Sequence, residues 1–441
     1  MRLRVLFYAV NGLGLGHLTR LMGIARALRR LAPGCEILFL TSSEAAHLAY
    51  REGFASVKLP SRNAARRGEL RQSTFTRLGQ SLVWNTLSAF DPHVLVVDTF
   101  ALGSWHELGP ILRWPLRKAF VFRAQKSERA LEPAFVEALK LYDLILIPHH
   151  AQDDEVAPHE LSLPRETRVL WTGPMTLRGR SELLGRDAAR ARLSRDGCLS
   201  LEPNDLLGLV ALGGGGGPGL HAARALLADA IRLLQQGPDE RLGRVRWIEL
   251  AGPLDAASID APEPPAEPQV LAGTPALPDE ALTPNLEPDS AKPCAAGALP
   301  WLVLRDVHPM GSVLRAFDGA VAAAGYNTVH EAQVAALPTL LWPFARDVDD
   351  QFARARLLAS QNRALVFEAA SQPSDEAPAQ PRAEPRAEQL AEQLAEVFGA
   401  ATSSRLRASM LAAQAARRTW QADANGTHEA ARAILDLLGP R

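Results

Sequence analysis

The stretch from Ala324 to Glu331 reads Ala-Gly-Tyr-Asn-Thr-Val-His-Glu and joins an apolar run, 319–323, to a segment with helical spacing. Asn327 or Thr328 can cap that helix, so its first-turn N–H groups face an anion held at the end of the strand. Glu331 lies one turn further in, where a carboxylate can accept hydrogen bonds from a diol such as a ribose. This strand-to-helix unit is typical of a doubly wound sheet, which binds ligands at the carboxyl ends of its strands.

Two glycine-rich turns take equivalent places earlier in the chain. Residues 11–17, Asn-Gly-Leu-Gly-Leu-Gly-His, follow the first apolar run, and 213–217 are five consecutive glycines between an apolar run and a helical segment. Backbone N–H groups in such turns can approach a phosphate closely. NAD is disfavoured, because position 17 is histidine and because Thr41–Ser43 stand where an acid would hold the ribose. No lysine of a P-loop follows the second turn.

Apolar runs alternate with amphipathic segments through both halves of the chain. Near-continuous apolar strands with helical spacers indicate parallel sheets covered on both faces. The expected fold class is therefore α/β, with two Rossmann-like doubly wound domains facing across a cleft. The expected strands are 3–10, 36–41, 93–100, 118–123, 143–148, 168–173, 206–212, 244–251, 302–307, 319–323, 339–343 and 364–368.

Composition shifts along the chain suggest where the domains divide. We expect an N-terminal domain over 1–173, a hinge over 174–204, a C-terminal domain over 205–402 and a final helix within 403–441. Packing of that helix against the N-terminal domain is one option. Residues 254–299 and 370–388 are rich in proline, alanine and charge and lack periodicity, so we expect disordered insertions there.

Composition excludes several functional classes. The 441 residues are 47% hydrophobic and 22% charged, which is typical of a soluble protein with more than one domain. A formal net charge of −1 provides no field that favours nucleic acid. Three widely spaced cysteines, Cys35, Cys198 and Cys294, form no disulfide framework or CxxC metal site. Without a signal segment or an apolar run of about 18 residues, we expect a cytoplasmic protein.

His17 and Asp98 are the candidate catalytic residues. His17 starts a helix directly after a glycine turn, and an imidazole there can take a proton from an attacking hydroxyl. A capping or substrate-orienting histidine is the alternative. Asp98 ends the strand expected over 93–100 and should point into the cleft, as a base, as a partner that orients His17, or as a helix cap. Arg123 ends the next strand, where it meets an acceptor's anion or is simply solvated.

The longest motif carries a family resemblance. From Gly325 to Gln351 the chain has the layout G-x-x-T-x-x-E, then L-P, then P-F, then Q. In order, spacing and context this resembles the GT-B glycosyltransferases, and in particular the bacterial family that adds N-acetylglucosamine, from a UDP-linked donor, to the lipid-linked peptidoglycan precursor. Weaker similarity runs through both glycine turns, so the resemblance spans most of the chain outside the insertions.

The resemblance implies a role for each matching position. Gly14 and Gly16 would approach the donor phosphates, and His17 takes the place of the family's loop histidine. Gly215, beside Gly214, stands where the family has a serine. The remaining implied donor contacts are Val307 and Met310 at the nucleobase, Gly325, Tyr326, Asn327 and Thr328 at the diphosphate, Glu331 at the ribose, and Asp350 with Gln351 at the transferred sugar. Asp347 and Asp349 match a D-x-D metal motif, but they lie in the family's sugar loop, so no metal is expected.

Departures from the family pattern leave the substrates open. The first turn is G-L-G-L-G-H where the family has G-G-T-G-G-H, and Asp350 replaces a sugar-facing glutamine. The expected function is transfer of a hexose-type sugar from a nucleotide donor, with UDP favoured, to an unidentified acceptor hydroxyl, with inversion and without a metal ion or other cofactor. A hydrolysing nucleotide-sugar epimerase of the same fold and a non-catalytic nucleotide-sugar-binding protein are the alternatives.

The expected partners are therefore a nucleotide sugar and an acceptor, and no nucleic acid. The arginines of 62–71 form a basic stretch that reads best as a solvated loop, with a peripheral contact to anionic lipid at the inner face of the membrane as the alternative. The oligomeric state stays open.

Overall fold

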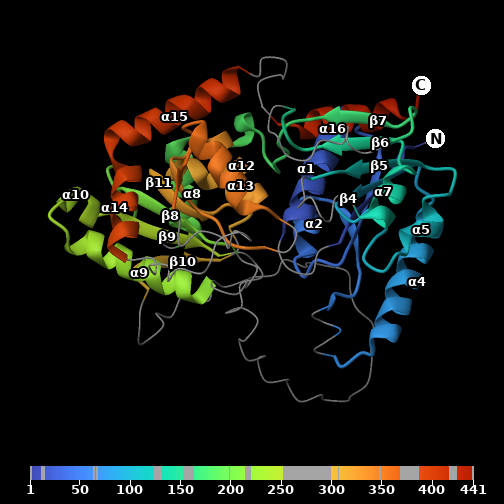
Figure 1. The fold of residues 1–441 in the computed structure, drawn as a ribbon, viewed down its shortest axis with the longest axis horizontal. Coiled ribbons are helices and arrows are strands. Elements are labelled where there is room, and N and C mark those ends of the chain that lie inside the picture. Colours follow the sequence, from blue (N-terminus) through green and yellow to red (C-terminus); the bar gives the residue numbers. More distant parts are fainter. Residues whose placement is uncertain are drawn as a thin grey trace, which may run out of the picture.

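The computed structural model shows two lobes, one built from each half of the chain (Figure 1). It describes residues 2–10, 15–62, 65, 68–123, 132–151, 163–197, 199–213, 220–251, 299–305, 307–346, 349–367, 387–416 and 425–439. Nearly all of the two expected insertions, and the glycines at 14, 214 and 215, lie outside these residues. Ala387 and Glu388, expected in the second insertion, instead begin a helix.

The N-terminal lobe contains a seven-stranded sheet in the order β3-β2-β1-β4-β5-β6-β7. Every strand pair in it is parallel. Most residues of its interior strands are apolar because helices cover both faces. The strands are β1 (Arg4–Ala9), β2 (Glu36–Thr41), β3 (Ala55–Lys58), β4 (Val94–Asp98), β5 (Arg117–Val121), β6 (Leu144–Ile147) and β7 (Arg168–Trp171).

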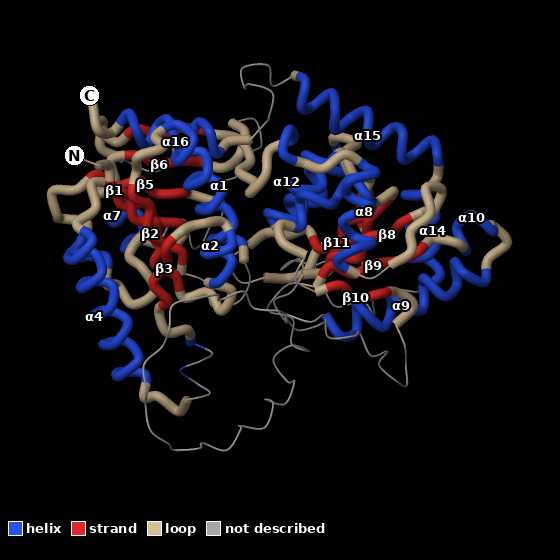
Figure 2. Tube along the Cα trace, turned by 180° about the vertical axis from the view of Figure 1, so that it is seen from behind, coloured by secondary structure: helices blue, strands red, loops and turns tan. Residues whose placement is uncertain are grey.

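The C-terminal lobe repeats the arrangement with six parallel strands in the order β10-β9-β8-β11-β12-β13 (Figure 2). They are β8 (Leu207–Ala211), β9 (Arg246–Leu250), β10 (Leu302–Leu304), β11 (Gly319–Ala323), β12 (Thr339–Trp342) and β13 (Leu365–Val366). In each sheet the first strand of the lobe lies at the centre and the chain winds outward on both sides. The expectation of two doubly wound α/β domains is confirmed.

Two apolar cores enclose the N-terminal sheet. One lies under α1 (Gly16–Leu31) and α2 (His47–Arg51). The other lies under α4 (Gln72–Phe90), α5 (Leu108–Ile111) and α7 (Pro133–Leu139). Phe7 on β1 belongs to the first core and its neighbour Tyr8 to the second, because successive strand side chains point to opposite faces.

The C-terminal sheet is enclosed in the same way. One core lies under α9 (Leu220–Gln236) and α14 (Ala387–Phe398), and another under α8 (Arg186–Asp196), the 3₁₀ helix η3 (Met310–Ala316) and α12 (Tyr326–Ala335). The remaining helices of this half are η2 (Arg180–Glu182), α10 (Glu240–Gly243), α13 (Gln351–Ser360) and α15 (Ala400–Ala415). The segment expected as a hinge, 174–204, therefore contains a helix, α8, that packs into the C-terminal lobe.

The end of the chain returns to the N-terminal lobe. Helix α16 (Thr427–Asp436) places Ala430 and Ile434 in the same core as α1. A Cβ at Gly23 on α1 would come within 2.9 Å of the Cγ2 atom of Thr427, the first residue of α16, so glycine permits this close packing. Where the sequence predicts one helix near the end, the described residues form two, and α15 stays on the C-terminal lobe. No helix among the described residues is long and apolar enough to cross a membrane.

Candidate functional site at the domain junction

The predicted site residues follow the central strands of the two sheets. His17 follows β1 and Asp98 ends β4, and these two strands are neighbours. In the other lobe, the glycine turn follows β8 and Tyr326 follows the neighbouring β11. The connections from such a strand pair leave in opposite directions and open a crevice at the carboxyl ends, where doubly wound sheets bind ligands. The structure thus brings residues from both lobes to one junction.

His17 and Asp98 lie side by side at this junction. The His17 Nδ1 atom is 3.3 Å from Asp98 Oδ1, and the histidine side chain is 12% exposed whereas the aspartate is fully buried. Asp98 is held mainly by Arg20, which lies one turn after His17 on α1. The Arg20 Nε donates to Oδ2 at 2.9 Å and its Nη2 donates to Oδ1 at 3.0 Å. The Thr99 hydroxyl donates to Oδ1 at 2.6 Å.

These contacts determine the charge of both groups. Burial raises the pKa of Asp98, but Arg20 and His17 outweigh burial and hold that pKa far below its ordinary range. Burial lowers the pKa of His17, and the nearby charges of Arg20 and Arg123 lower it further against the opposing pull of Asp98. Asp98 is therefore a carboxylate with both oxygens engaged, and His17 is a neutral imidazole near pH 7. Both oxygens of Asp98 already accept hydrogen bonds from Arg20 or Thr99, so the geometry disfavours Asp98 as a base.

The first residues of α12 contact the N-terminal lobe. The Tyr326 hydroxyl donates to the Pro148 carbonyl at 2.6 Å and accepts from the Met175 N–H at 3.0 Å. The Asn327 side-chain amide donates to the Thr19 hydroxyl on α1. Since both side chains are engaged in this way, a diphosphate contact at these positions would come from backbone N–H groups. Thr328 is half-buried in the same turn.

A buried ion-pair network continues from this turn. Asp349 accepts from Arg123 of the N-terminal lobe at 2.9 Å and from Arg354 on α13 at 2.8 Å. The guanidinium of Arg20 lies over the Tyr326 ring, 4.8 Å from its centroid. Arg123 is only 9% exposed, so it is not the solvated strand-end arginine that the sequence left as one option.

Glu331 faces η3 from the next turn of α12. A Cβ on Gly311 would lie 3.6 Å from the Glu331 carboxyl carbon, so this carboxyl group lies against the start of η3, beside Met310. Val307 and Met310 are partly buried and pack against the core that lies under α8, η3 and α12. Burial raises the pKa of Glu331 from 4.5 to about 7, and only the charge of Arg178 opposes it. The structure therefore brings together the residues assigned to the nucleobase and the ribose.

The remaining assigned residues lie near the start of α13. Asp350 caps that helix, with its Oδ1 accepting from the Ala353 N–H at 2.9 Å. Gln351 is 4% exposed and its side-chain oxygen accepts from the Phe344 N–H at 3.0 Å. Its Nε2 lies 3.9 Å from the position that a Cβ on Gly325 would take, so the amide group faces the α12 turn. A Cβ on Gly16 would meet no atom within 4 Å, so the backbone at the start of α1 is open.

Sequence reasoning missed Arg20 and Arg354. Arg20 lies three residues after His17, the last residue of the quoted glycine turn, and this spacing places the two side chains on the same face of a helix. That spacing is the signal that could have found it. Arg354 gives no such signal, because the Ala324 carbonyl, which accepts from its Nη1 at 2.8 Å, lies 30 positions earlier in the chain.

Comparison with known proteins gives matches in structure but not in sequence. No family model and no curated protein sequence matches the chain. A UDP-glucosyltransferase from Polygonum tinctorium capable of glucosylating indoxyl superimposes with a TM-score of 0.61 at 14% identity, over 100% of this chain and 99% of that one. UGT2 of Phytolacca americana, complexed with UDP-2-fluoro-glucose and pterostilbene, gives a TM-score of 0.60 at 13% identity, over 99% and 100%.

A third similar structure is the spinosyn forosaminyltransferase SpnP, with a TM-score of 0.57 at 13% identity over the whole of both chains. At these identities the likeness concerns the fold. Together with the two parallel sheets and their strand orders, it establishes that this chain has the GT-B fold.

Proposed function

We propose that this protein is a glycosyltransferase that moves a hexose-type sugar from a nucleotide donor to an acceptor hydroxyl. The observation that carries the proposal is the pair His17 and Asp98 at the junction of a GT-B fold, with the first turn of α12 directly across from it. In this proposal the N-terminal domain binds the acceptor and the C-terminal domain binds the donor.

The proposed reaction is a direct displacement at the anomeric carbon. In this proposal the proton of His17 is on Nδ1, which lies 3.3 Å from the Asp98 carboxylate without a hydrogen bond between them. The Nε2 atom then has a free lone pair, which accepts the proton of the acceptor hydroxyl. The acceptor oxygen bonds to the anomeric carbon as the bond to the diphosphate oxygen breaks, so the configuration inverts. The nucleoside diphosphate leaves with the negative charge, which backbone N–H groups at the start of α12 stabilise. The proposal uses no metal ion.

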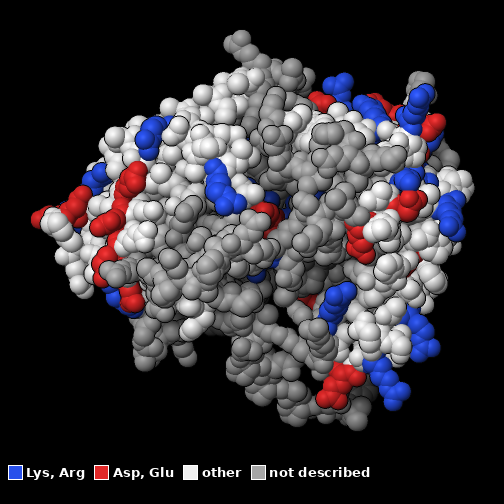
Figure 3. Space-filling model, in the orientation of Figure 1, with Lys and Arg blue, Asp and Glu red and all other residues white. Residues whose placement is uncertain are grey.

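UDP is the favoured nucleotide. Two of the similar structures are a UDP-glucosyltransferase and a complex with a UDP-sugar analogue. A spinosyn rhamnosyltransferase, SpnG, is complexed with thymidine diphosphate, so dTDP is the second nucleotide to test. The epimerase alternative needs a carboxylate free to remove a sugar proton, and both oxygens of Asp98 are occupied. Acidic and basic side chains are interspersed on the face shown in Figure 3, in keeping with small-molecule partners rather than nucleic acid.

The first experiment is a thermal-shift screen against UDP, dTDP, GDP, ADP, their common sugar conjugates and NAD. A selective rise in melting temperature with one nucleoside diphosphate and its sugar supports the donor site, because a ligand that binds the native state stabilises it. That nucleotide sugar then enters a transfer assay with a panel of hydroxyl acceptors. A shift with NAD alone, or with none of the ligands, contradicts the proposal.

His17→Ala separates transfer from binding. We expect turnover to fall by about 10² to 10⁴, since general base catalysis contributes a factor of that size, while nucleotide affinity stays within about twofold. His221→Ala, at an exposed position on α9, is the matched control and should keep full activity. Equal turnover in both variants removes His17 from the mechanism, and nucleotide binding without transfer in the wild type favours the non-catalytic alternative.

A further inference from the structure

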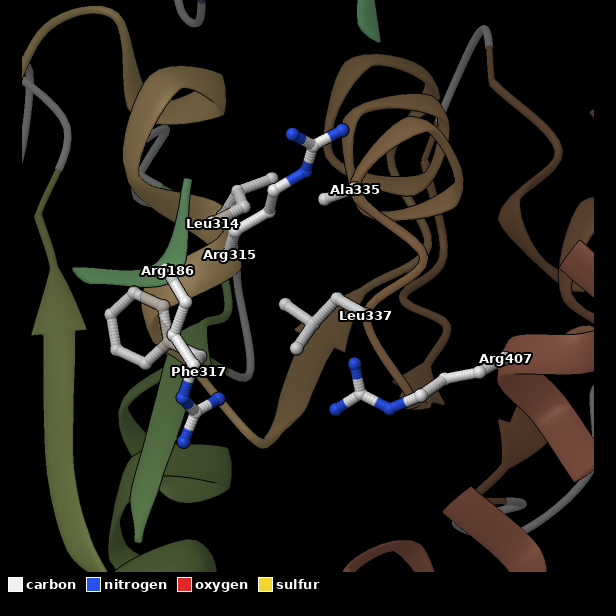
Figure 4. Close-up of a pocket in the computed structure, with 7 residues that line it drawn as sticks. All are labelled: Arg186, Leu314, Arg315, Phe317, Ala335, Leu337 and Arg407. Atoms are coloured by element: carbon white, nitrogen blue, oxygen red, sulfur yellow. The ribbon is translucent and has the colours of Figure 1, made fainter. Parts of the chain in front are cut away.

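A pocket in the C-terminal lobe lies at the edge of the sheet opposite to the candidate site (Figure 4). Phe317 and Leu337 line it and precede β11 and β12, so the pocket is at the amino ends of those strands. The Arg315 guanidinium extends away from those of Arg186 and Arg407. The three cations do not converge on one ligand, and the pocket does not define a site.

The loop after β4, residues 99–107, borders the candidate site instead. It follows Asp98 directly and ends at Glu107, the residue before α5. Phe100, near the start of the loop, packs against His17, with ring centroids 5.7 Å apart and ring planes at 46°. This separation is within the range of aromatic pairs that attract each other in proteins. The loop therefore places an aromatic side chain against the candidate base.

His17 needs such a neighbour because its Nδ1 is not held by a hydrogen bond. That atom is buried and lies 3.3 Å from Asp98 Oδ1, but it has no hydrogen-bond partner in the part of the chain that the structure describes. Packing rather than hydrogen bonding at Nδ1 therefore sets the orientation of the imidazole, and Phe100 is an aromatic group in contact with it.

The backbone of the loop has an unusual conformation. Thr99 and His106 have φ values of 65° and 59°, in the left-handed region that non-glycine residues seldom adopt. Such a conformation persists only where the surrounding contacts hold it. One of these contacts is at the start of the loop, where the Tyr142 hydroxyl donates to the Ala101 carbonyl at 2.6 Å.

Glu107 holds the other end of the loop. It is fully buried, and its carboxyl group accepts from the backbone N–H groups of Ser104 at 3.2 Å and Trp105 at 2.7 Å. The Tyr8 hydroxyl on β1 donates to the same carboxyl group. A Cβ on Gly103 would overlap this carboxyl group, so the loop closes tightly around it. Glu107 thus fastens the loop to the central strand of the sheet.

We propose that Phe100 is a positioning residue for His17, and that Glu107 fixes the loop that carries it. This inference rests on the proposed function, in which His17 is the general base. The Phe100 ring covers one side of the imidazole, which keeps water away from it and limits its rotation. A base has to be neutral and directed at the acceptor hydroxyl before the proton moves.

Removing the Phe100 ring should raise the pKa of His17. Burial is the largest cause that lowers this pKa, the charges of Arg20 and Arg123 lower it further, and Asp98 opposes them. In Phe100→Ala water reaches the imidazole and part of the burial effect is lost. We therefore expect the pKa of His17 to rise by about one unit toward its ordinary value.

The test is an NMR titration of the His17 ring, whose signal is identified by its loss in His17→Ala. Phe90→Ala is the matched control, because Phe90 is also partly buried against the same core but precedes β4 instead of following it. It should leave the pKa of His17 unchanged. Phe100→Tyr keeps a ring against His17 and should also keep the wild-type pKa. This measurement needs no substrate.

A second variant leaves Phe100 in place. Glu107→Gln replaces one acceptor oxygen by an NH₂ group, so one of the loop's donors loses its partner and the loop is held less firmly. The charges that shift the pKa of His17 are those of Asp98, Arg20 and Arg123, so a shift in Glu107→Gln would reach His17 through the loop. We expect a rise that is smaller than in Phe100→Ala.

Transfer assays over the same pH range complete the experiment. In Phe100→Ala the acid limb of the kcat/KM profile should move to higher pH by the shift measured by NMR, with UDP affinity within about twofold of the wild type. The proposal is overturned if His17 has the same pKa in Phe100→Ala as in Phe90→Ala, and the role of Glu107 is overturned if Glu107→Gln leaves this pKa unchanged. A raised pKa with an unmoved acid limb supports the packing role of Phe100 but contradicts His17 as the base.

Discussion

Two carboxyl groups of the candidate site, Asp98 from the N-terminal lobe and Glu331 from the C-terminal lobe, have pKa values that are shifted in opposite directions. Asp98, at the end of β4, is fully buried and accepts two hydrogen bonds from Arg20. Glu331, on the second turn of α12, is half-buried and has no cation in hydrogen-bond contact among the described residues. The pKa of Asp98 is held far below its ordinary range, whereas that of Glu331 rises to about 7.

The difference shows that partners, rather than burial, decide what a carboxyl group at this site can do. Burial disfavours the charge in both cases, and only Asp98 has a guanidinium that outweighs it. Asp98 is therefore committed to its hydrogen bonds with Arg20, and it lies 3.3 Å from His17 Nδ1. Glu331 is left with acceptors that a ligand can use, which fits the ribose contact proposed for it.

The largest expected effect is on folding. In Asp98→Ala the guanidinium of Arg20, 2% exposed, loses its counter-ion, and we expect the free energy of unfolding to fall by about 3 to 5 kcal/mol. Asp436→Ala breaks an exposed pair with Arg168 and should cost less than about 1 kcal/mol. Urea denaturation of the variants measures both. Equal losses would mean that Asp98 contributes no more to the free energy of unfolding than a surface aspartate does.

The next effect is on nucleotide binding. Glu331→Gln should weaken UDP binding about tenfold to a hundredfold, because a hydrogen bond to a charged group contributes about 1.5 to 3 kcal/mol. For 2′-deoxy-UDP the same variant should lose less affinity than it loses for UDP, since only the 3′-hydroxyl remains to contact Glu331. Glu396→Gln, about half exposed on α14, is the control. An unchanged UDP affinity in Glu331→Gln would contradict the ribose assignment.

The smallest effect is on the pH dependence of stability. The charged form of Asp98 should stabilise the folded protein, whereas the charged form of Glu331 should destabilise it. The folded-state pKa of Asp98 is depressed, so its contribution is present above about pH 4 and is lost as the pH falls. That of Glu331 is raised from 4.5 to about 7, so the wild type loses stability as the pH rises through this window.

A shift from 4.5 to about 7 corresponds to about 3 kcal/mol, and solvent screening reduces this for a half-buried group. Glu331→Gln should remove that loss and be about 1 to 2 kcal/mol more stable than the wild type at pH 8, with no gain at pH 4. Denaturation at several pH values checks this, with Glu396→Gln again as the control. A gain that does not change with pH would show that Glu331 titrates in the folded protein as it does in the unfolded chain.

The fold could be predicted from the sequence because strands buried on both faces are apolar over most of their length. Interior strands such as Leu144–Ile147 are unambiguous for this reason. The expected list lacks β3, Ala55–Lys58, because this edge strand is partly exposed along its length and has the polar residues Ser56 and Lys58. The two final helices were expected as one, because helical spacing alone does not show where a chain crosses between lobes.

The candidate site could be predicted only in part from the sequence. Turn residues such as Gly325 and helix-start residues such as His17 are local features, and their order along the chain placed them at strand ends. The engagement of Tyr326 and Asn327 with the other lobe is not local, because it joins residues about 150 to 310 positions apart. No motif encodes such a contact.

The sequence by itself determined the class of fold, most of the strands along the chain and the turns that follow them, because hydrophobic periodicity and glycine content act over a few neighbouring residues. Only the tertiary structure decided which of these residues are free to act. A carboxyl group or a guanidinium takes its charge and its partners from whatever packs against it, and here Arg20 and Asp98 come together from 78 positions apart.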